Sequence, residues 1–173
     1  SAGVLHLAST AFMAGVIVFV QIVHYPLMAR VGRDGFVEYE RAHTVRTGWV
    51  VVPPMLTELA SAVWLVTLAE PGAEARLAWA GLGLLAVVWI STATLQAPAH
   101  GRLVHGFEGT VHDRLVRTNW IRTVAWLARL PIAIALLGEA APPPAPGWAL
   151  KHVLVPGAPP TPSVGPLAEA DPS

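Results

Sequence analysis

The feature that most constrains this chain is a set of four apolar runs, which cover residues 4–28, 49–69, 77–97 and 120–137. A helix needs roughly 20 apolar residues to cross a hydrocarbon layer about 30 Å thick. Because backbone that faces lipid must satisfy its own hydrogen bonds, the runs are expected to be helices, even where Pro53 and Pro54 predict a kink. The sequence therefore predicts an all-α, transmembrane four-helix bundle.

Composition agrees with a membrane chain and excludes several kinds of function. Only 13% of the residues are charged, against about 25% in soluble domains. The absence of cysteine excludes disulfides, thiolate metal sites and cysteine nucleophiles. A net charge of zero provides no basic face for nucleic acid. The partner expected first is the lipid bilayer.

Arginine is distributed unevenly between the two sides of the expected membrane. Positive residues are retained on the cytoplasmic side, and they gather after the first and third runs, whereas the opposite side offers only Arg76 and Lys151. We therefore expect a multi-pass protein of the cell inner membrane, with both termini on the non-cytoplasmic side. The retained residues are Arg30, Arg33, Arg41, Arg46, Arg102, Arg114 and Arg117.

The two cytoplasmic segments share a short pattern. Gly-Phe, eight residues, then Val-Arg-Thr-x-Trp occurs at 35–49 and again at 106–120, an offset of 71 residues. Two tandem helix-loop-helix units inserted in the same direction would be related by a pseudo-twofold axis along the membrane normal. The pattern predicts such a repeat.

The same offset relates two charged residues inside the apolar runs, Glu58 and Arg129. Each follows its tryptophan by nine residues, which corresponds to roughly 13 Å of helix rise and a position near mid-membrane. Charges at that depth usually pair in the interior of a bundle. We predict an ion pair between them, either as a structural lock or with a direct functional role.

Polar residues also form a layer under the cytoplasmic boundary, and they are candidates for a binding pocket. A mostly apolar pocket with a few directed polar groups suits a quinone-like, aromatic or isoprenoid molecule. Hydrogen bonding between helices is the alternative interpretation. The candidate cofactor-binding residues are Gln21, Tyr25, Gln96 and Asn119, and the candidate catalytic residues are His24, His100 and Arg122.

Histidines near this boundary suggest a metal or haem site. Glu40 and His43 stand three residues apart, and His112 stands four residues after Glu108, so each pair lies on one helical face. Carboxylate and imidazole together bind iron, zinc or copper, which makes Glu40, His43 and His112 candidate metal ligands. His24 and His100 are the natural pair for haem. The alternative is that these histidines are simply solvated or bonded to carbonyl groups.

The composition changes near residue 141. Residues 1–141 are expected to form the membrane domain, and residues 142–173 are a proline-rich segment typical of extended chain. Its apolar side chains, such as Trp148 and Leu154, would anchor a membrane-protein partner. Besides a hydrophobic-ligand oxidoreductase or oxygenase, the sequence therefore allows a non-catalytic subunit of a larger complex.

Two stretches carry a family resemblance. His24-Tyr25-Pro26 and Asn119-Trp120-x-Arg122 resemble small bacterial four-helix membrane proteins, and more weakly the anthrone oxygenase-like family. That resemblance implies oxygenation of a polycyclic aromatic substrate, with the pocket's polar groups as acid-base candidates. His6, Met13-Ala14-Gly15 and His24-Tyr25-Pro26-Leu27 also resemble the membrane protoporphyrinogen oxidase type, which would imply haem.

Overall fold

A computed structural model describes residues 2–139, so the proline-rich segment and the partner expected for it lie outside the described residues. The described part is 91% helical and contains no strand. Its elements are α1 (Ala2–Phe19), the π-helix η1 (Val20–His24), α2 (Tyr25–Met28), α3 (Arg33–Leu68), α4 (Ala73–Ser91), the π-helix η2 (Thr92–Gln96), α5 (Ala97–Leu103) and α6 (Gly109–Glu139).

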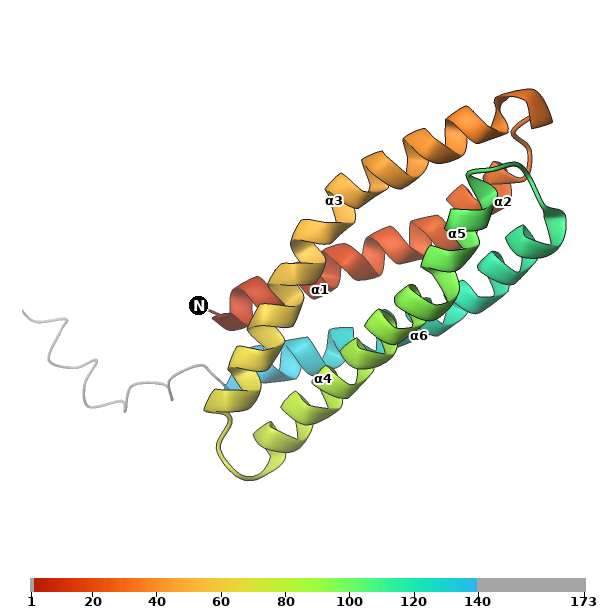
Figure 1. The fold of residues 1–173 in the computed structure, drawn as a ribbon. Helices are drawn as coiled ribbons and strands as arrows, with labels where there is room; N and C mark the ends of the chain where they lie inside the picture. Colours follow the sequence, from red (N-terminus) through yellow and green to blue (C-terminus); the bar gives the residue numbers. More distant parts are fainter. Residues whose placement is uncertain (1, 140–173) are drawn as a thin grey trace, which may run out of the picture. The chain divides into compact units, whose positions relative to one another are not determined.

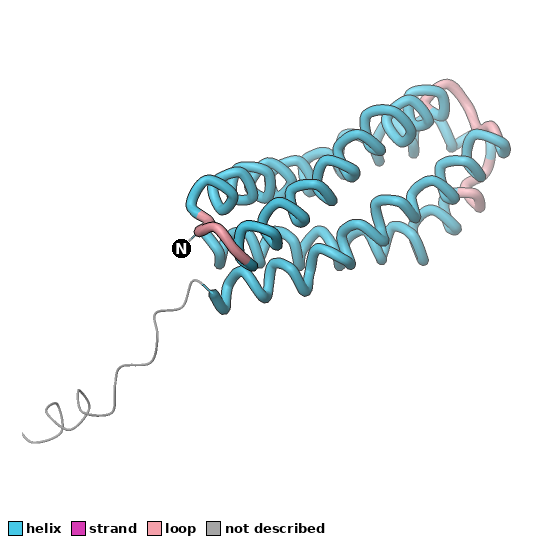
Figure 2. The backbone as a smooth tube through the Cα atoms, turned by 90° about the horizontal axis from the view of Figure 1, so that it is seen from below, coloured by secondary structure: helices cyan, strands magenta, loops and turns pink. Residues whose placement is uncertain are grey.

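The elements form four antiparallel rods (Figure 1). The first is α1 with η1 and α2, the second is α3, the third is α4 with η2 and α5, and the fourth is α6. Helix α6 packs mainly against α1 and α4, and α3 packs against the same two helices from the other side. Figure 2 shows the loops confined to the two ends of the bundle. All four rods are long and apolar enough to cross a membrane.

The second and fourth helices begin earlier than the apolar runs indicate. Helix α3 starts at Arg33 rather than near Trp49, and α6 starts at Gly109 rather than near Trp120. The intervening residues are polar but carry no helix breaker except glycine, so the helices continue beyond the expected hydrocarbon layer. Helix α3 runs unbroken through Pro53 and changes direction near its middle (Figure 1), as expected for proline within a helix.

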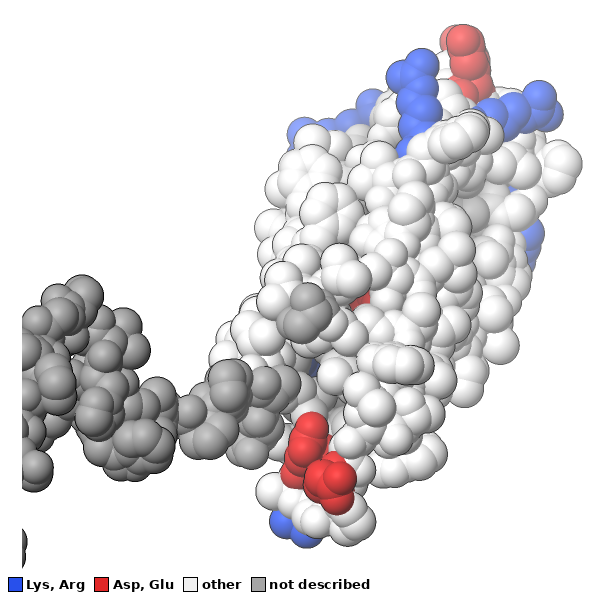
Figure 3. Space-filling view, turned by 90° about the vertical axis from the view of Figure 1, so that its left-hand side faces the viewer, with Lys and Arg blue, Asp and Glu red and all other residues white. Residues whose placement is uncertain are grey.

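The bundle has apolar groups outside and polar groups inside. Trp49 is 78% exposed and Ile90 62% exposed, whereas Thr10 and Asn119 are fully buried. Figure 3 shows an almost uncharged band between charged ends, with most of the visible lysine and arginine atoms at one end. Water would disfavour such an exterior, whereas lipid accommodates it. The described helices are thus those of a multi-pass membrane protein.

The first and third rods contain the same irregularity. The five-residue π-turns η1 and η2 each lie just before a proline, Pro26 and Pro98. Each wide turn inserts about one extra residue, which rotates the following side chains by roughly 100° around the helix. This rotation determines which residues of α2 and α5 face the bundle interior, Tyr25 and Ala99 among them.

Candidate functional site: an apolar cavity with a polar end

A cavity of about 530 Å³ lies between the rods on the side where the π-turns occur. Apolar side chains from α1, α3 and α6 form most of its wall, including Met13, Ile17, Val51, Met55 and Trp126. Polar groups gather at one end, from α2, α3, η2, α5 and α6: Tyr25, His43, Thr47, Thr92, Gln96, His100 and Arg122.

Arg122 is a partly buried cation at this polar end. Its Nε donates to Asn119 Oδ1 at 2.9 Å, and Nη2 bonds the same oxygen. Its remaining donors reach the hydroxyls of Thr92 at 3.4 Å and Tyr25 at 3.3 Å. Every one of these partners is neutral, and none of the ion pairs among residues 2–139 includes Arg122.

The Tyr25 hydroxyl connects Arg122 to a carboxylate–imidazole pair. It lies 3.1 Å from His100 Nε2, and His100 Nδ1 lies 2.5 Å from Glu40 Oε1. The Glu40 side chain is fully buried. Because Glu40 comes from α3, His100 from α5 and Tyr25 from α2, this line of groups exists only when the three elements are packed together.

The predicted polar layer divides into two groups. Gln21 accepts from Asn119 Nδ2 at 2.8 Å and donates to the Val116 carbonyl at 3.2 Å. These two side chains are buried and do not line the cavity, so they join η1 to α6 and orient Arg122. Gln96 accepts from the Ser91 hydroxyl at 3.0 Å and does line the cavity.

The predicted histidines also separate. His24 does not line the main cavity; its ring stacks on His43 at 4.3 Å, and His43 lies 5.3 Å from His100. The His43 imidazole thus lies beside both His24 and His100, the two residues predicted as the haem pair. The structure does not bring His112 to Glu40 and His43, because His112 Nε2 bonds the backbone carbonyl of Tyr25 at 2.9 Å.

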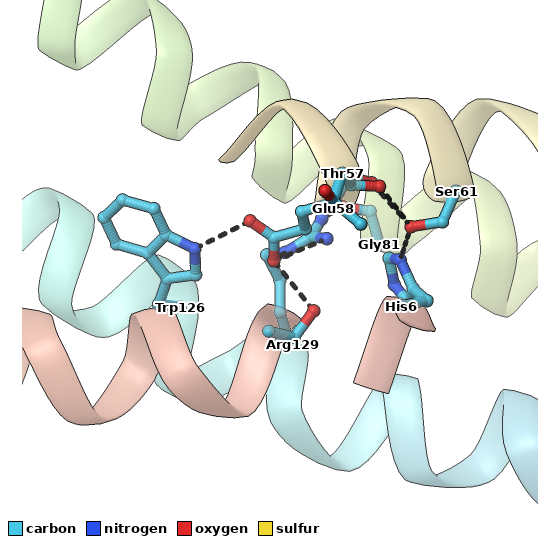
Figure 4. A network of polar contacts seen from close by, with 8 residues as sticks. His6, Thr57, Glu58, Ser61, Gly81, Trp126 and Arg129 are labelled. Carbon is cyan, nitrogen blue, oxygen red and sulfur yellow. Dashed lines mark hydrogen bonds and ion pairs between the residues drawn. The ribbon is translucent and has the colours of Figure 1, made fainter. Parts of the chain in front are cut away.

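Glu58 and Arg129 lie together deeper in the bundle, and neither lines the cavity, although Trp126 of the cavity wall contacts Glu58. Arg129 Nη2 is 3.0 Å and Nε 3.1 Å from Glu58 Oε1, and both residues are essentially fully buried. The Thr10 hydroxyl donates to Oε1 at 2.8 Å and the Trp126 indole to Oε2 at 3.0 Å. Arg129 Nη1 also bonds the Gly81 carbonyl. Figure 4 shows this network, in which neighbouring groups surround the carboxylate.

Sequence reasoning missed several members of both groups. Thr10 and His6 stand four residues apart on α1, as the buried face of a helix requires, and this spacing could have linked them to the network. His6 Nδ1 lies 3.0 Å from the Ser61 hydroxyl. No local pattern singles out Thr47 or Met55 as cavity residues, because their placement depends on how α3 is rotated in the bundle.

Fold and site together define a class: a four-helix protein, with helices long and apolar enough to cross a membrane, and an apolar cavity between them that ends at an arginine. Comparison places the chain in no narrower group, since no family model matches it and neither a curated protein nor a solved structure does so. The resemblances drawn from short stretches of sequence therefore gain no support from these comparisons.

Proposed function

We propose that this membrane protein binds an apolar molecule carrying an acidic oxygen, with that oxygen against Arg122 and the remainder in the cavity. The observation that carries the proposal is the arginine with only neutral partners at the end of an apolar chamber. A charge in such surroundings is costly unless a counter-charge approaches it. An anionic ligand supplies that counter-charge.

The walls define the rest of the ligand. A volume of about 530 Å³ falls within the range of roughly 300–1,000 Å³ typical of small-molecule sites. Methionine, valine, isoleucine and tryptophan side chains line it, which suits aromatic rings or isoprenoid chains. A quinone-like or hydroxy-aromatic compound combines such a body with an ionisable oxygen.

The polar end can also move a proton. Tyr25 can exchange its hydroxyl proton with the ligand oxygen while His100 Nε2 accepts or returns a proton, and Glu40 fixes the orientation of the imidazole through Nδ1. Arg122 stabilises the oxyanion formed in that exchange. For a quinone-like ligand that receives two electrons from a separate redox partner, these groups would deliver the two accompanying protons, which is the basis for proposing an oxidoreductase.

Matched probes test the binding step. In mild detergent, calorimetry should show that 2-hydroxy-1,4-naphthoquinone, which is anionic at neutral pH, binds about tenfold or more tightly than 1,4-naphthoquinone. Arg122→Gln should remove this preference, because a hydrogen bond to a charged group contributes about 1.5–3 kcal/mol, or roughly 10- to 100-fold in affinity. Arg117→Gln is the control, since Arg117 is exposed on the same helix.

Two results would contradict the proposal. One is equal affinity of the wild-type protein for the anionic and neutral naphthoquinones. The other is an unchanged preference in a folded Arg122→Gln protein.

The orientation in the membrane is also a proposal. The charge bias supports an inner-membrane protein with both termini outside the cytoplasm. Since the chain has no cysteine, a single cysteine at Glu70 should react with a membrane-impermeant thiol reagent in intact spheroplasts, and one at Gly32 should not. The reverse pattern would refute this orientation.

The tandem repeat remains part of the proposal as well. Its support is the sequence offset together with the two π-turns, each followed by a proline at nearly the same offset. In a duplicated bundle, the same wide turn in both halves would open a chamber at one level. That level is where the cavity lies.

A further inference from the structure

Beside the cavity, a carboxylate and imidazoles from separate elements converge in an arrangement that the acid-base proposal does not explain. Glu40 and His43 come from consecutive turns of α3, and His100 comes from α5. One potential ligand atom from each lies within 4.8 Å of the other two. His24, from η1, stacks on His43 at 4.3 Å.

Two buried atoms of this group have no hydrogen-bond partner among the described residues, Glu40 Oε2 and His24 Nε2. Glu40 is fully buried, with 0% of its surface exposed. Leaving a buried acceptor unsatisfied costs about 1–3 kcal/mol, and more for a charged group. Native proteins contain few such atoms, and some of those few face a bound ion.

We propose that Glu40, His43 and His100 bind a divalent first-row transition-metal ion. Neutral imidazoles with one carboxylate and no thiolate suit zinc, iron or cobalt. Three protein ligands leave a coordination position open, and that position adjoins the cavity because His43 and His100 also line it.

The hydrogen bonds of the two imidazoles leave one nitrogen of each for the ion. The Thr47 hydroxyl lies 3.0 Å from His43 Nδ1, which leaves Nε2 for the ion. The Tyr25 hydroxyl occupies His100 Nε2, which leaves Nδ1, and Nδ1 faces Glu40 at 2.5 Å. Metal-binding histidines almost always hydrogen-bond through their second nitrogen in this way.

The distances require only a small adjustment. Donors bound to one tetrahedral ion at about 2.0–2.2 Å lie roughly 3.3–3.6 Å apart, so atoms now within 4.8 Å need to close by up to about 1.5 Å. The ion would take the place of the proton shared by Glu40 and His100, and those two atoms would then separate to about 3.5 Å, the spacing of tetrahedral ligands at such bond lengths. With the ion on Nδ1, His100 Nε2 would carry the ring hydrogen and donate it to the Tyr25 hydroxyl, so the proton transfer proposed above belongs to the metal-free form.

Titration with Co²⁺ tests the site. The full chain is purified in mild detergent with an affinity tag that lacks histidine, treated with a chelator, and titrated with Co²⁺ while the visible absorption spectrum is recorded. We expect one equivalent to bind per chain with the spectrum of a nitrogen–oxygen site, and Zn²⁺ to displace it. If the wild-type protein binds less than half an equivalent of Co²⁺ at micromolar concentration, that result by itself overturns the proposal.

Variants locate the ion. Glu40→Gln and His43→Asn should each weaken Co²⁺ binding at least about tenfold, in line with the effect of losing a ligand group. His105→Asn should not, because His105 is an exposed histidine at the same end of the bundle. Unchanged Co²⁺ affinity in folded Glu40→Gln protein would also overturn the proposal.

The metal site goes beyond the proposed ligand function and is measured without the naphthoquinone probes. Arg122→Gln should lose the preference for the anionic probe and keep the Co²⁺ stoichiometry. A chain that binds Co²⁺ but does not distinguish the two probes would refute the ligand proposal alone, and the converse result would refute the metal site alone.

Discussion

Two arginines on α6, Arg122 and Arg129, stand about two turns apart and differ in whether the chain supplies a counter-charge to them. Arg129 is 1% exposed and pairs with Glu58 at 3.0 Å in a closed network. Arg122 lines a cavity and contacts only hydroxyls and an amide oxygen. The first cation is neutralised by the chain itself. Under the proposed function, the second receives its counter-charge from a bound ligand.

Charge placement within the membrane makes this contrast informative. Inserting a charged residue at the centre of a spanning helix costs roughly 2.5–3.5 kcal/mol, so such residues usually pair with another group and serve structure or function. Arg129 has that partner and locks α3 to α6. Arg122 is instead held in position by Asn119, which Gln21 orients in turn. A positioned cation facing a chamber is typical of a binding group.

The largest expected effect comes from breaking the closed pair. Glu58→Gln should lower the free energy of unfolding by about 3–5 kcal/mol, because Arg129 is left as an uncompensated buried charge. The measurement is denaturant unfolding in detergent, followed by circular dichroism. Glu38→Gln, on the exposed face of the same helix, should change the free energy by no more than about 0.5 kcal/mol.

A double replacement separates charge from packing. Glu58→Leu combined with Arg129→Met removes both charges and should recover most of the lost stability, since apolar residues often replace a buried pair without loss. If the double variant is as unstable as Glu58→Gln, the pair is not what Glu58 contributes.

The second prediction gives Arg122 a carboxylate from the chain, as Glu58 provides for Arg129. Thr92→Asp would place a carboxylate where the Thr92 hydroxyl now lies 3.4 Å from Arg122. The affinity for 2-hydroxy-1,4-naphthoquinone should then fall about 10- to 100-fold, because an internal acid competes for the guanidinium. Calorimetry measures it.

Thr92→Asn is the matched control, since it has the same shape without the charge. Its affinity should stay within about threefold of wild type, which is less than 1 kcal/mol. If asparagine weakens binding as strongly as aspartate, the effect is steric and the comparison of the two arginines loses its basis.

The sequence was sufficient for the number and order of the long helices and for the contact between Glu58 and Arg129, but not for where α3 and α6 begin. Apolar runs determine the spans because lipid leaves few alternatives, and equal spacing from equivalent tryptophans places the two charges at one depth. Depth follows from counting residues along a helix. Contact with a particular neighbour depends also on how each helix is rotated. The polar face of α1 is turned toward this pair, since the Thr10 hydroxyl donates to Glu58 at 2.8 Å.

The cavity site was less accessible to such counting. Tyr25 and His100 were singled out, but their meeting at 3.1 Å depends on η1 and η2, and π-turns have no local sequence signature beyond the prolines that follow. The sequence also does not distinguish which of the histidines near one boundary lie close together in the fold. His100 rather than His112 joins Glu40 and His43 because of how α5 and α6 are rotated.

The smallest expected effect concerns one hydrogen bond of the closed network. Trp126→Phe removes the indole N–H that donates to Glu58 Oε2 at 3.0 Å and should lower the free energy of unfolding by about 1–3 kcal/mol, the cost of a buried acceptor left unpaired. Trp89→Phe makes the same truncation where the indole nitrogen has no partner among residues 2–139. Its loss therefore measures packing, offset by the removal of a buried N–H that has no partner.

The difference between the two tryptophan variants isolates the bond, provided both unfolding curves are recorded in the same detergent. A larger loss at Trp126 means that the carboxylate needs donors on both oxygens, as the structure provides for Glu58. A ligand oxyanion in the cavity would then need a donor such as the Tyr25 hydroxyl in addition to Arg122. Equal losses would mean that Arg129 alone satisfies the carboxylate. The Glu58–Arg129 site would then be a simple ion pair, and a ligand oxyanion in the cavity would need no donor besides Arg122.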